Sequence, residues 1–452
     1  MWLSLLQSHQ IIGWNRKYLH RNQVNIRVFP SELRGSISAP PSKSVMQRMV
    51  AGALLADGTS IVHNISQSDD CTAALQLAAQ LGAEIEIGET SVKINGVGGK
   101  LHPRTKTLHV GESGLSARLF TAIAGLATPP LSIDGEKSLR GRPMDDLASV
   151  FEQLEGHLTT TNGSFPLHMQ KGIRSGDASL NGSISSQFLT GLLFTLPNLS
   201  GNSSLFIQQL KSAPYVQLTL EILEDFGINI DHDEGFQRFH IEGSQKFDPI
   251  ETVVDGDWSG AAAIAVAGML CASDSIGISG LDNQYTQADE AIRGALLFAG
   301  GALSGTEDGI QIARRPVRAF HLDLRESPDL FPVLAALAAH GKKPSRIQGI
   351  HRLYQKESNR AQAIQSEWEK FGIKVELDEA SDSMVVHPRK EMMNEPMTIE
   401  TYGDHRIAMA TTILAMTGKN SVVIKDADCV AKSYPEFFDD LVMLGALLET
   451  AR

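Results

Sequence analysis

A pattern that returns six times at nearly equal intervals most limits the folds open to this chain. In each copy a glycine ends a polar helical segment and precedes an alternating strand, at Gly82, Gly156, Gly227, Gly300, Gly372 and Gly445. Glycine is the usual residue just past a helix end. The strict alternation in 83–87 and 373–377 predicts strands. The sequence therefore predicts six copies of one α/β unit.

A second marker keeps the same spacing, a small, acidic or proline residue that opens an apolar helix. It occurs at Ser44, Gly114, Ser185, Asp257, Pro328 and Asp404. The apolar segments, such as 261–267, are too hydrophobic for a surface helix, so each is predicted to lie inside its domain.

The first of these starts is Pro40-Pro41-Ser42-Lys43-Ser44. The prolines favour an extended approach, and the serines are good N-cap residues. The first turn of a helix exposes unpaired N–H groups, which suit a phosphate or carboxylate. Arg48 follows Ser44 by one helical turn and is predicted to reach back to the same anion. An ordinary capped helix is the alternative for this stretch taken alone.

Chain length and net charge limit the number of domains and the kinds of partner to be expected. Six units in 452 residues divide into two domains of three, and the net charge of −12 argues against a nucleic-acid surface.

The three cysteines, Cys71, Cys271 and Cys429, are too widely spaced for a disulfide framework or a zinc site. This is typical of a protein of the reducing cytoplasm. No stretch approaches the length of a membrane span. Residues 1–22 lie outside the repeat and are read as an N-terminal extension.

Polar runs stand at the helix starts of several units. They are 112–118, 138–144, 183–188, 356–360 and 404–406. Each alone would be read as a helix cap or a solvated charge cluster. Equivalent points of repeated units tend to face a common surface, however, so together these runs predict a binding surface for phosphates and carboxylates.

These runs carry a resemblance to a known family. From Val24 to the C-terminus the chain resembles the enolpyruvyl transferases, and among them the 5-enolpyruvylshikimate-3-phosphate synthase (3-phosphoshikimate 1-carboxyvinyltransferase) family. The motifs that carry the resemblance are Pro41-Ser42-Lys43-Ser44 with Arg48, Gly114 with Arg118, Arg142-Pro143-Met144, Ser185-Ser186-Gln187-Phe188, Ser212 with Tyr215, Lys356-Glu357 with Arg360, Asp404-His405-Arg406, and Cys429-Val430-Ala431-Lys432.

The resemblance implies an α/β fold, a two-domain inside-out α/β barrel of six repeated βαβαββ units, three per domain, around an interdomain cleft. Residues 42–254 would form the N-terminal domain, and residues 23–41 with 255–452 the C-terminal domain. The N-terminal strand would then belong with the C-terminal domain. A monomer without nucleic-acid or membrane partners is expected.

The resemblance also implies two substrates and their ligands. The residues expected to hold shikimate 3-phosphate are Lys43, Ser44, Arg48, Ser185, Ser186, Gln187, Ser212, Tyr215, Asp329 and Lys356. The residues expected to hold phosphoenolpyruvate are Lys43, Gly114, Arg142, Gln187, Arg360, Arg406 and Lys432.

The implied reaction transfers the enolpyruvyl group of phosphoenolpyruvate to the 5-hydroxyl of shikimate 3-phosphate, in the shikimate pathway to chorismate and aromatic amino acids. It requires no metal or organic cofactor. Glu357 would exchange a proton with the methylene carbon, Asp329 would accept the proton of the attacking hydroxyl, and Lys43 would assist. His405 would either take part in catalysis or only shape the loop before Arg406. Glyphosate is expected to compete with phosphoenolpyruvate beside Gly114.

Three alternatives are weighed from the residues. A sister enzyme, the UDP-N-acetylglucosamine enolpyruvyl transferase, commonly carries a cysteine in the loop 139–142 and an asparagine after the first lysine, where this chain has no cysteine and Ser44. An inactive binding protein on the same scaffold would be expected to lose Glu357, Asp329 or the cations, and all are present. An RNA-end-processing relative would be expected to be basic. Departures from the family pattern stand at Leu115, Trp258, Arg352 and Asn359.

Overall fold

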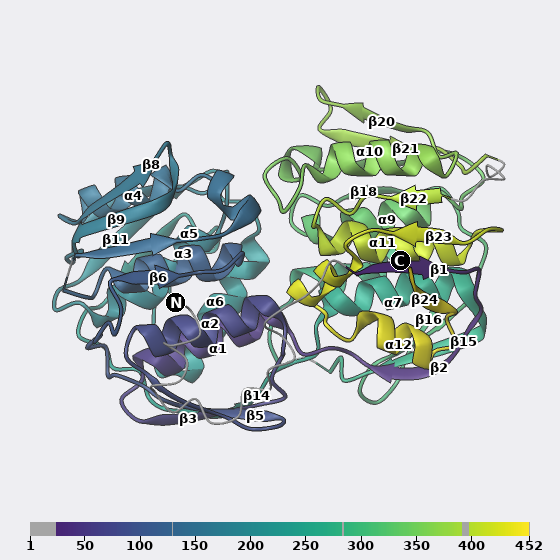
Figure 1. Ribbon diagram of the computed structural model, residues 1–452. Coiled ribbons are helices and arrows are strands. Elements are labelled where there is room, and N and C mark those ends of the chain that lie inside the picture. Colours follow the sequence, from purple (N-terminus) through teal and green to yellow (C-terminus); the bar gives the residue numbers. More distant parts are fainter. Residues whose placement is uncertain (1–23, 129, 283, 391–396, 452) are drawn as a thin grey trace. The chain divides into compact units, whose positions relative to one another are not determined.

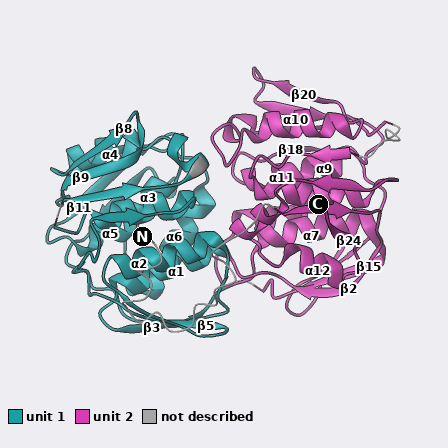
Figure 2. Cartoon of the chain, viewed as in Figure 1, with its two compact units in different colours: residues 1–20, 43–254 teal, residues 21–42, 255–452 magenta. Residues whose placement is uncertain are grey.

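The computed structural model describes residues 24–128, 130–282, 284–390 and 397–451. The extension predicted at residues 1–22 lies outside the described residues. The described chain divides into two units (Figures 1 and 2), residues 43–254 as unit 1 and residues 24–42 with 255–451 as unit 2. Each unit is built from three sheets of four strands within the described residues.

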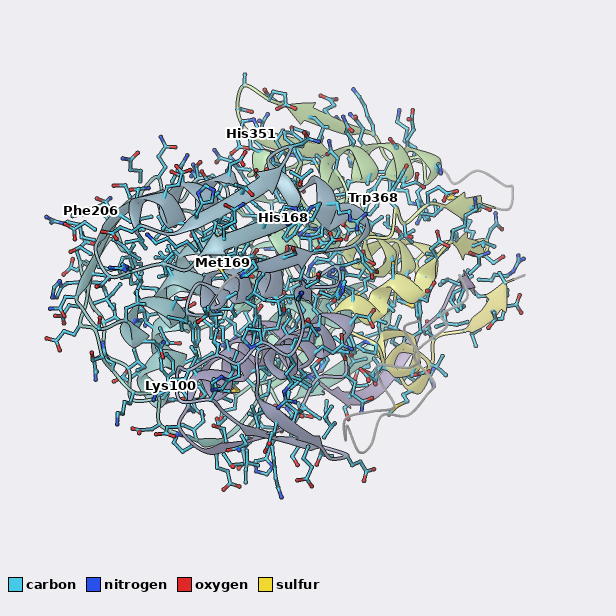
Figure 3. All side chains as sticks on the ribbon, turned by 60° about the vertical axis from the view of Figure 1, so that its left-hand side comes forward. Lys100, His168, Met169, Phe206, His351 and Trp368 are labelled. Atoms are coloured by element: carbon cyan, nitrogen blue, oxygen red, sulfur yellow. The ribbon has the colours of Figure 1, made fainter. Side chains whose placement is uncertain are left out.

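The three sheets of unit 1 follow one plan, in which one strand pair is parallel and two are antiparallel. In their spatial order the strands are β14 (Glu251–Val253), β3 (Thr59–His63), β5 (Ser91–Asn95) and β4 (Glu84–Ile87); β6 (Thr107–His109), β7 (Leu131–Asp134), β9 (Ser164–Lys171) and β8 (His157–Thr161); and β10 (Asp177–Asn181), β11 (Ser203–Gln208), β13 (Arg238–Ile241) and β12 (Asp231–His232). Side chains alternate between core and solvent, as at the buried Met169 and exposed His168 of β9 (Figure 3).

Unit 2 repeats this plan. Its strands, again in spatial order, are β16 (Ala302–Gly305), β17 (Ile310–Ala313), β15 (Ala272–Ser279) and β2 (Leu33–Ser38); β18 (His321–Asp323), β19 (Ser345–Gln348), β21 (Ser383–Val386) and β20 (Val375–Asp378); and β22 (Met397–Ile399), β23 (Val422–Ile424), β1 (Asn25–Val28) and β24 (Leu448–Ala451).

Three of the sheets are completed by segments far away in sequence. β2 adds to β15 in parallel, with Ile37 opposite Ile278. β14 adds to β3 in parallel, with Thr252 opposite Val62, so the end of unit 1 closes its first sheet. β1 lies between β23 and β24 in unit 2, where Ile26 pairs with Ile424 and Thr450. Each unit is thus closed on itself by its own first or last strand.

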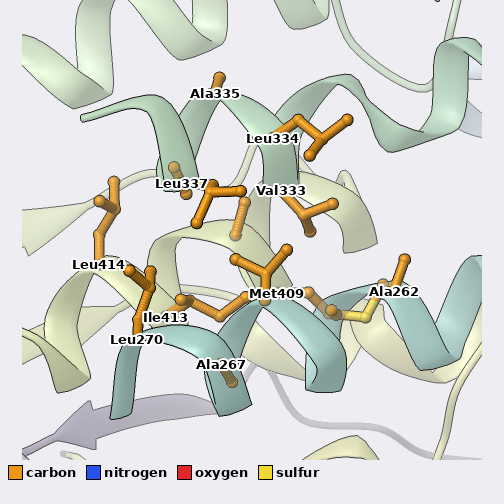
Figure 4. Close-up of a cluster of buried hydrophobic side chains, with 14 of the residues drawn as sticks. Ala262, Ala267, Leu270, Val333, Leu334, Ala335, Leu337, Met409, Ile413 and Leu414 are labelled. Carbon is orange, nitrogen blue, oxygen red and sulfur yellow. The ribbon is translucent and has the colours of Figure 1, made fainter. Parts of the chain in front are cut away.

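One helix of each repeat is buried along almost its whole length, as predicted. These inner helices are α1 (Lys43–Leu55), α3 (Gly114–Ala124) and α5 (Gln187–Thr195) in unit 1, and α7 (Trp258–Cys271), α9 (Phe331–Ala338) and α11 (His405–Met416) in unit 2. In unit 2 they contact one another through side chains such as Ala267, Leu337 and Met409 (Figure 4). A helix with no polar face can be stable in water only when other elements surround it.

The second helix of each repeat carries more polar residues. These outer helices are α2 (Asp69–Gln80), α4 (Asp145–Gln153), α6 (Ala213–Asp225), α8 (Ile292–Phe298), α10 (Arg360–Lys370) and α12 (Phe437–Met443). Short 3₁₀ turns in the connections are η2 (Lys137–Gly141), η3 (Leu196–Asn198), η4 (Ala288–Ala291), η5 (Pro328–Leu330), η6 (Ile350–Arg352) and η7 (Ala427–Lys432).

The glycines predicted to end the outer helices are left-handed at five of the six positions, for example φ 123° at Gly82. The second repeat differs, because Glu155 takes the left-handed conformation there with φ 57°. Gly156 is needed for another reason, since a Cβ on it would lie 2.9 Å from Cγ2 of Ile173.

The predicted α/β class with six repeated units is confirmed. The predicted helix starts are also close to those observed, because Asp257 and Asp404 are N-caps of α7 and α11. Pro328 instead opens η5, and α9 begins at Phe331. Within the described residues no helix has the length and apolar character needed to cross a membrane.

Candidate active site

The first turns of α1 and α3 are tied together by a buried amide. Gln47 accepts hydrogen bonds from Ser113 Oγ at 2.9 Å and Ser116 Oγ at 2.7 Å through its Oε1, and it donates to the Lys43 carbonyl at 3.3 Å. Ser113 is also the N-cap of α3. Lys43 and Gly114, which belong to successive repeats, therefore stand at one end of a shared helix pair.

Lys43 is held by a carboxylate from the start of α2. Its Nζ lies 3.1 Å from Oδ2 of Asp70, and the two side chains are 16% and 5% exposed. A partly buried ion pair of this kind limits where the ammonium can point. Asp70 is therefore a residue of this site.

Four residues meet where α3 begins, and we name them the Gly114 cluster: Gly114, Arg118, Arg142 and Gln187. A Cβ on Gly114 would lie 2.6 Å from Nη1 of Arg142, 3.4 Å from Nη1 of Arg118 and 3.7 Å from Oε1 of Gln187. Two guanidinium groups thus approach bare backbone at a helix N-terminus. This combination of cations and N–H groups favours an anion.

Arg118 is buried in this cluster. Its Nη1 donates to the Gly114 carbonyl at 3.1 Å and to Oε1 of Gln187 at 3.3 Å, and its guanidinium lies 5.0 Å from the ring centre of Phe188. The sequence indicated it only as an arginine one turn into a capped helix. Its contacts make it a support for Gln187 and for the backbone at Gly114.

The remaining predicted ligands of unit 1 lie at the starts of α5 and α6. Ser186 is the N-cap position of α5, and Ser185 Oγ accepts a hydrogen bond from the Gln187 amide at 3.2 Å. Ser212 precedes α6 in a left-handed conformation with φ 58°. A serine in this conformation is strained, which is common where a side chain must be aimed at a ligand.

Arg48 is predicted from the sequence to reach back to an anion at Ser44, but its contacts in the structure are hydrogen bonds to groups of the protein. It is 1% exposed, and it donates to the Ser44 carbonyl at 2.8 Å, to Thr219 Oγ1 at 2.9 Å and to the Tyr215 carbonyl at 3.2 Å. Burial lowers the pKa of Arg48 to about 10. In this structure Arg48 fastens α1 to α6 and so positions Ser44 and Tyr215.

The predicted residues of unit 2 are brought together around one guanidinium. Arg360 is buried, and it reaches Asp329 Oδ1 at 2.8 Å with Nη1, Glu357 Oε2 at 2.7 Å with Nη2, and Asp404 Oδ2 at 2.8 Å with Nε. Burial alone would lower the pKa of Arg360, but the three carboxylates outweigh it and raise that pKa. We name Asp329, Lys356, Glu357, Arg360, Asp404 and Arg406 the Arg360 cluster.

Asp404 organises the start of α11. Its Oδ1 accepts from the Arg406 amide at 3.0 Å as an N-cap, and its Oδ2 accepts from Ser358 Oγ at 3.0 Å. Asn359, one of the departures, caps α10 by accepting from the Gln362 amide at 3.2 Å. The asparagine therefore does not leave Arg360 without a carboxylate partner, because Asp404 supplies one.

Asp329 is shared by three cations. In addition to Arg360, Lys356 Nζ lies 3.2 Å from its Oδ1 and Arg406 Nη2 lies 3.3 Å from its Oδ2. Burial would raise the pKa of Asp329, but Arg406, Lys356 and Arg360 together hold it well below its ordinary value. Burial also lowers the pKa of Lys356.

The guanidinium of Arg406 contacts Ser259 through two of its three nitrogens. Its Nη2 donates to Ser259 Oγ at 2.9 Å and its Nη1 to the Ser259 carbonyl at 3.3 Å. Its Nε is buried and has no hydrogen-bond partner among the described residues. A buried N–H of this kind is costly unless an acceptor is supplied, so it points to a ligand oxygen.

His405 and Lys432 are both buried near this cluster. His405 Nδ1 lies 3.9 Å from Asp404 Oδ1, which is too long for a hydrogen bond. Lys432 ends η7, which packs against α11. Within the described residues no group of His, Cys, Asp or Glu has the arrangement of a metal site.

Two residues of the second unit were missed by sequence reasoning. Asp289 in η4 accepts a hydrogen bond from Ser259 Oγ, and Ser259 in turn contacts Arg406. The repeat contained a signal that could have found Asp289. The outer helices begin within a few residues of Asp70, Arg142, Ser212, Asp289, Arg360 and Lys432, so a polar residue just before α8 could have been sought.

Comparisons with known proteins agree with this geometry. The model of the EPSP synthase (3-phosphoshikimate 1-carboxyvinyltransferase) family matches residues 29–441. The 3-phosphoshikimate 1-carboxyvinyltransferase of Clostridium kluyveri is 34% identical over 425 residues, which are 94% of this chain and 98% of that protein. The protein of the same name from Methanocaldococcus jannaschii is 33% identical and covers 92% of this chain and 97% of its own.

Solved structures show the same fold. The EPSP synthase of Acinetobacter baumannii superposes with a TM-score of 0.77 at 22% identity, over 95% of this chain and all of that chain. The enolpyruvyl transferase NikO of Streptomyces tendae gives a TM-score of 0.73 at 16% identity, over 96% of this chain and all of its own. The family model and the two relatives that match along almost their whole length decide the matter: the chain belongs to the EPSP synthase family of 3-phosphoshikimate 1-carboxyvinyltransferases.

Proposed function

We propose that this protein transfers the enolpyruvyl group of phosphoenolpyruvate to the 5-hydroxyl of shikimate 3-phosphate and releases phosphate, as the family's name describes. The reaction belongs to aromatic amino-acid biosynthesis. The observation that carries the proposal is the buried Nε of Arg406, which has no hydrogen-bond partner among the described residues, on a guanidinium that shares Asp329 with Arg360. Phosphoenolpyruvate offers carboxylate and phosphate oxygens for such a donor.

Phosphoenolpyruvate is assigned to the residues richest in cations. They are Lys43, Gly114, Arg142, Gln187, Arg360, Arg406 and Lys432. Support comes from the Gly114 cluster, where bare backbone leaves room beside Arg142, and from the Arg360 cluster. Arginine forks match carboxylates and phosphates, so these residues would bind both ends of the substrate.

Shikimate 3-phosphate is assigned to the helix starts rich in hydroxyl groups. The residues are Lys43, Ser44, Arg48, Ser185, Ser186, Gln187, Ser212 and Tyr215, with Asp329 and Lys356. Arg48 would act indirectly by positioning Ser44 and Tyr215. Its hydrogen bonds to the carbonyls of these two residues support this role. The hydroxyls and the N–H groups of the helix starts suit a sugar-acid phosphate.

The chemistry requires one acid and one base. Glu357 gives a proton to the methylene carbon of phosphoenolpyruvate, and C2 becomes electrophilic. The 5-hydroxyl adds to C2 while Asp329 accepts its proton, with Lys43 beside the reacting oxygens. In the second step phosphate leaves the tetrahedral intermediate, and Glu357 takes back a proton from the methyl group to form the enolpyruvyl double bond.

The contacts of Arg360 suggest how substrate binding prepares these groups. An ion pair with a buried arginine favours the charged form of a carboxyl group. When phosphoenolpyruvate takes Arg360 and Arg406, Glu357 and Asp329 lose part of this stabilisation. The charges of Arg406 and Arg360 help to hold the pKa of Asp329 well below its ordinary value, so sharing them with the substrate would weaken that effect. His405 is assigned only to this neighbourhood, either as a proton carrier or as a residue that shapes the start of α11.

Phosphate release from phosphoenolpyruvate tests the proposal. The protein is assayed with shikimate 3-phosphate and, separately, with UDP-N-acetylglucosamine. We expect turnover only with shikimate 3-phosphate. Turnover only with the UDP-sugar would assign the sister activity, and binding without turnover in either assay would indicate an inactive binding protein.

The location and assembly of the protein are further parts of the proposal. Cys71, Cys271 and Cys429 are free thiols, which agrees with a reducing cytoplasm. A monomer is expected, and light scattering at assay concentration would test this. The substrates are the partners that the family implies.

A further inference from the structure

Asp289 is a buried carboxylate outside the residues assigned above. It is 2% exposed in η4, and its Oδ2 accepts the hydrogen bond of Ser259 Oγ. No group of the described residues forms a hydrogen bond with its Oδ1. A half-satisfied buried carboxylate destabilises a fold, so its presence indicates a role in function.

Ser259 links Arg406 to Asp289 by two hydrogen bonds, and the donor of each bond can be assigned. Ser259 has a single hydroxyl proton, and a carboxylate can only accept. The proton therefore goes to Asp289, and Ser259 Oγ must accept from Arg406 Nη2 at 2.9 Å. The Ser259 carbonyl accepts a hydrogen bond from Nη1 of the same guanidinium at 3.3 Å.

The turn that carries Asp289 is anchored on two sides. Gln287 accepts from the Trp258 amide at 3.1 Å and donates to the Gly256 carbonyl at 2.8 Å, which joins the turn to the start of α7. Ser327, two residues before Asp329, donates to the Ala288 carbonyl at 2.7 Å. Asp289 therefore has a defined position relative to both Ser259 and Asp329.

This arrangement decides which edge of Arg406 is available. Ser259 accepts one hydrogen bond from Nη1 and one from Nη2, and Nε is the nitrogen that has no hydrogen-bond partner within the described residues. Asp329 touches Nη2 only at 3.3 Å. Without the hold of Ser259, the guanidinium could turn to make a bidentate pair with Asp329, which would occupy both the cation and the proposed base.

We propose that Asp289 is a positioning residue, which acts through the Ser259 hydroxyl to keep Arg406 turned toward phosphoenolpyruvate and away from Asp329. The proposal rests on the proposed function in that it takes Arg406 as a phosphoenolpyruvate ligand. It assigns no contact between Asp289 and either substrate.

The experiment compares Asp289→Ala, Ser259→Ala, the double variant and Asp289→Asn in the full chain. Dissociation constants of both substrates are measured by calorimetry, along with steady-state rates and melting temperatures. Each single alanine variant is expected to raise the dissociation constant of phosphoenolpyruvate about 10-fold. The double variant should raise it no more than Ser259→Ala alone. Asp289→Asn, which can still accept from Ser259, should recover most of the affinity. Shikimate 3-phosphate affinity should fall by less than phosphoenolpyruvate affinity, because its proposed ligands in unit 1 are untouched and only its proposed contact with Asp329 is altered.

Glu290→Ala is the matched control, since Glu290 follows Asp289 in the same turn and is exposed. Equal loss for both substrates, additive losses in the double variant, or an Asp289→Ala protein with parental phosphoenolpyruvate affinity would each overturn the positioning role. Arg406→Ala separates this result from the proposed function. If Arg406→Ala left phosphoenolpyruvate affinity unchanged, the assignment of Arg406 itself would fail, whatever Asp289 does.

Discussion

Arg360 Nη2 lies 2.7 Å from Glu357 Oε2, so the proposed proton donor is held in an ion pair by a neighbour one helical turn away. The arginine is 1% exposed and the glutamate 11%, which shields the pair from water. The pair therefore fixes where the Glu357 carboxyl group lies relative to Arg360.

Replacing Glu357 by glutamine tests the proton transfer. The amide keeps the size of the side chain and can still accept from Arg360, but it cannot donate and recover a proton. We expect kcat to fall by about 10²–10⁴ while phosphoenolpyruvate binding stays measurable by calorimetry. Glu369→Gln on the exposed face of α10 is the control. Turnover of Glu357→Gln near the parental rate would rule out this mechanism, although the family assignment would stand.

Removing the Arg406 side chain tests substrate binding instead. The alanine variant loses the unpartnered Nε and the two donors that face Ser259. Phosphoenolpyruvate binding should weaken by about 1.5–3 kcal/mol, the range for a hydrogen bond to a charged group. Arg325→Ala, at an exposed arginine, should bind both substrates as the parent does. An unchanged dissociation constant in Arg406→Ala would remove this residue from the binding site.

Asp329→Asn should affect both rate and affinity. The amide cannot accept the proton of the attacking hydroxyl, and it removes the negative charge shared by Lys356, Arg360 and Arg406. We expect kcat to fall on the order of 10²-fold or more and shikimate 3-phosphate to bind more weakly. Single-turnover rates and calorimetric titration of each substrate separate the two effects. A variant with weaker binding but a parental rate at saturation would leave the base unidentified.

Gly114→Ala tests the expected competition by glyphosate. The added methyl would lie 2.6 Å from Nη1 of Arg142, so that side chain must shift and the space beside the backbone becomes smaller. Inhibition constants against phosphoenolpyruvate should rise markedly for glyphosate in the variant. Gly294→Ala, where a Cβ meets no atom within 4 Å, is the control. Equal inhibition of the parent and Gly114→Ala would contradict the placement of the inhibitor.

Stability should depend on pH through Asp289. Burial, followed by Asp329, raises the pKa of Asp289 to about 6, and Asp257 adds to this, while Arg406 and the Ser259 hydroxyl act against it. A carboxyl group with a raised pKa favours the fold at low pH, and this contribution is lost as pH rises from the ordinary aspartate pKa through about 6. The melting temperature of Asp289→Asn relative to the parent should therefore increase between pH 4 and pH 7.

The expected size is a few °C, since a rise from the ordinary aspartate pKa to about 6 corresponds to at most about 3 kcal/mol. Thermal melts of both proteins in buffers of equal ionic strength would measure it. Glu290→Gln, which changes an exposed carboxylate, should show no such trend. A constant difference between Asp289→Asn and the parent across this range would mean that Asp289 does not titrate there.

The repeat and its local signals could be predicted because they depend on short stretches of sequence. Glycines such as Gly82, caps such as Asp404 and the apolar inner helices each act through neighbours within a turn or two. The roles proposed for residues such as Arg142 and Arg360 came from the resemblance to the enolpyruvyl transferases, because the repeat alone predicts only a shared polar surface at the helix starts.

The partners of these residues were decided only by the tertiary structure. Arg48 meets Thr219 at a separation of 171 residues, and Arg406 meets Ser259 at 147. In the sequence Asp289 stands beside Glu290 in an ordinary polar run, and only packing against Ser259 buries it. Local sequence sets where a helix begins and which faces are apolar, because those depend on backbone sterics and periodicity. Which guanidinium faces which carboxylate depends on side-chain directions and on burial between distant segments, and these exist only after the repeats have packed together.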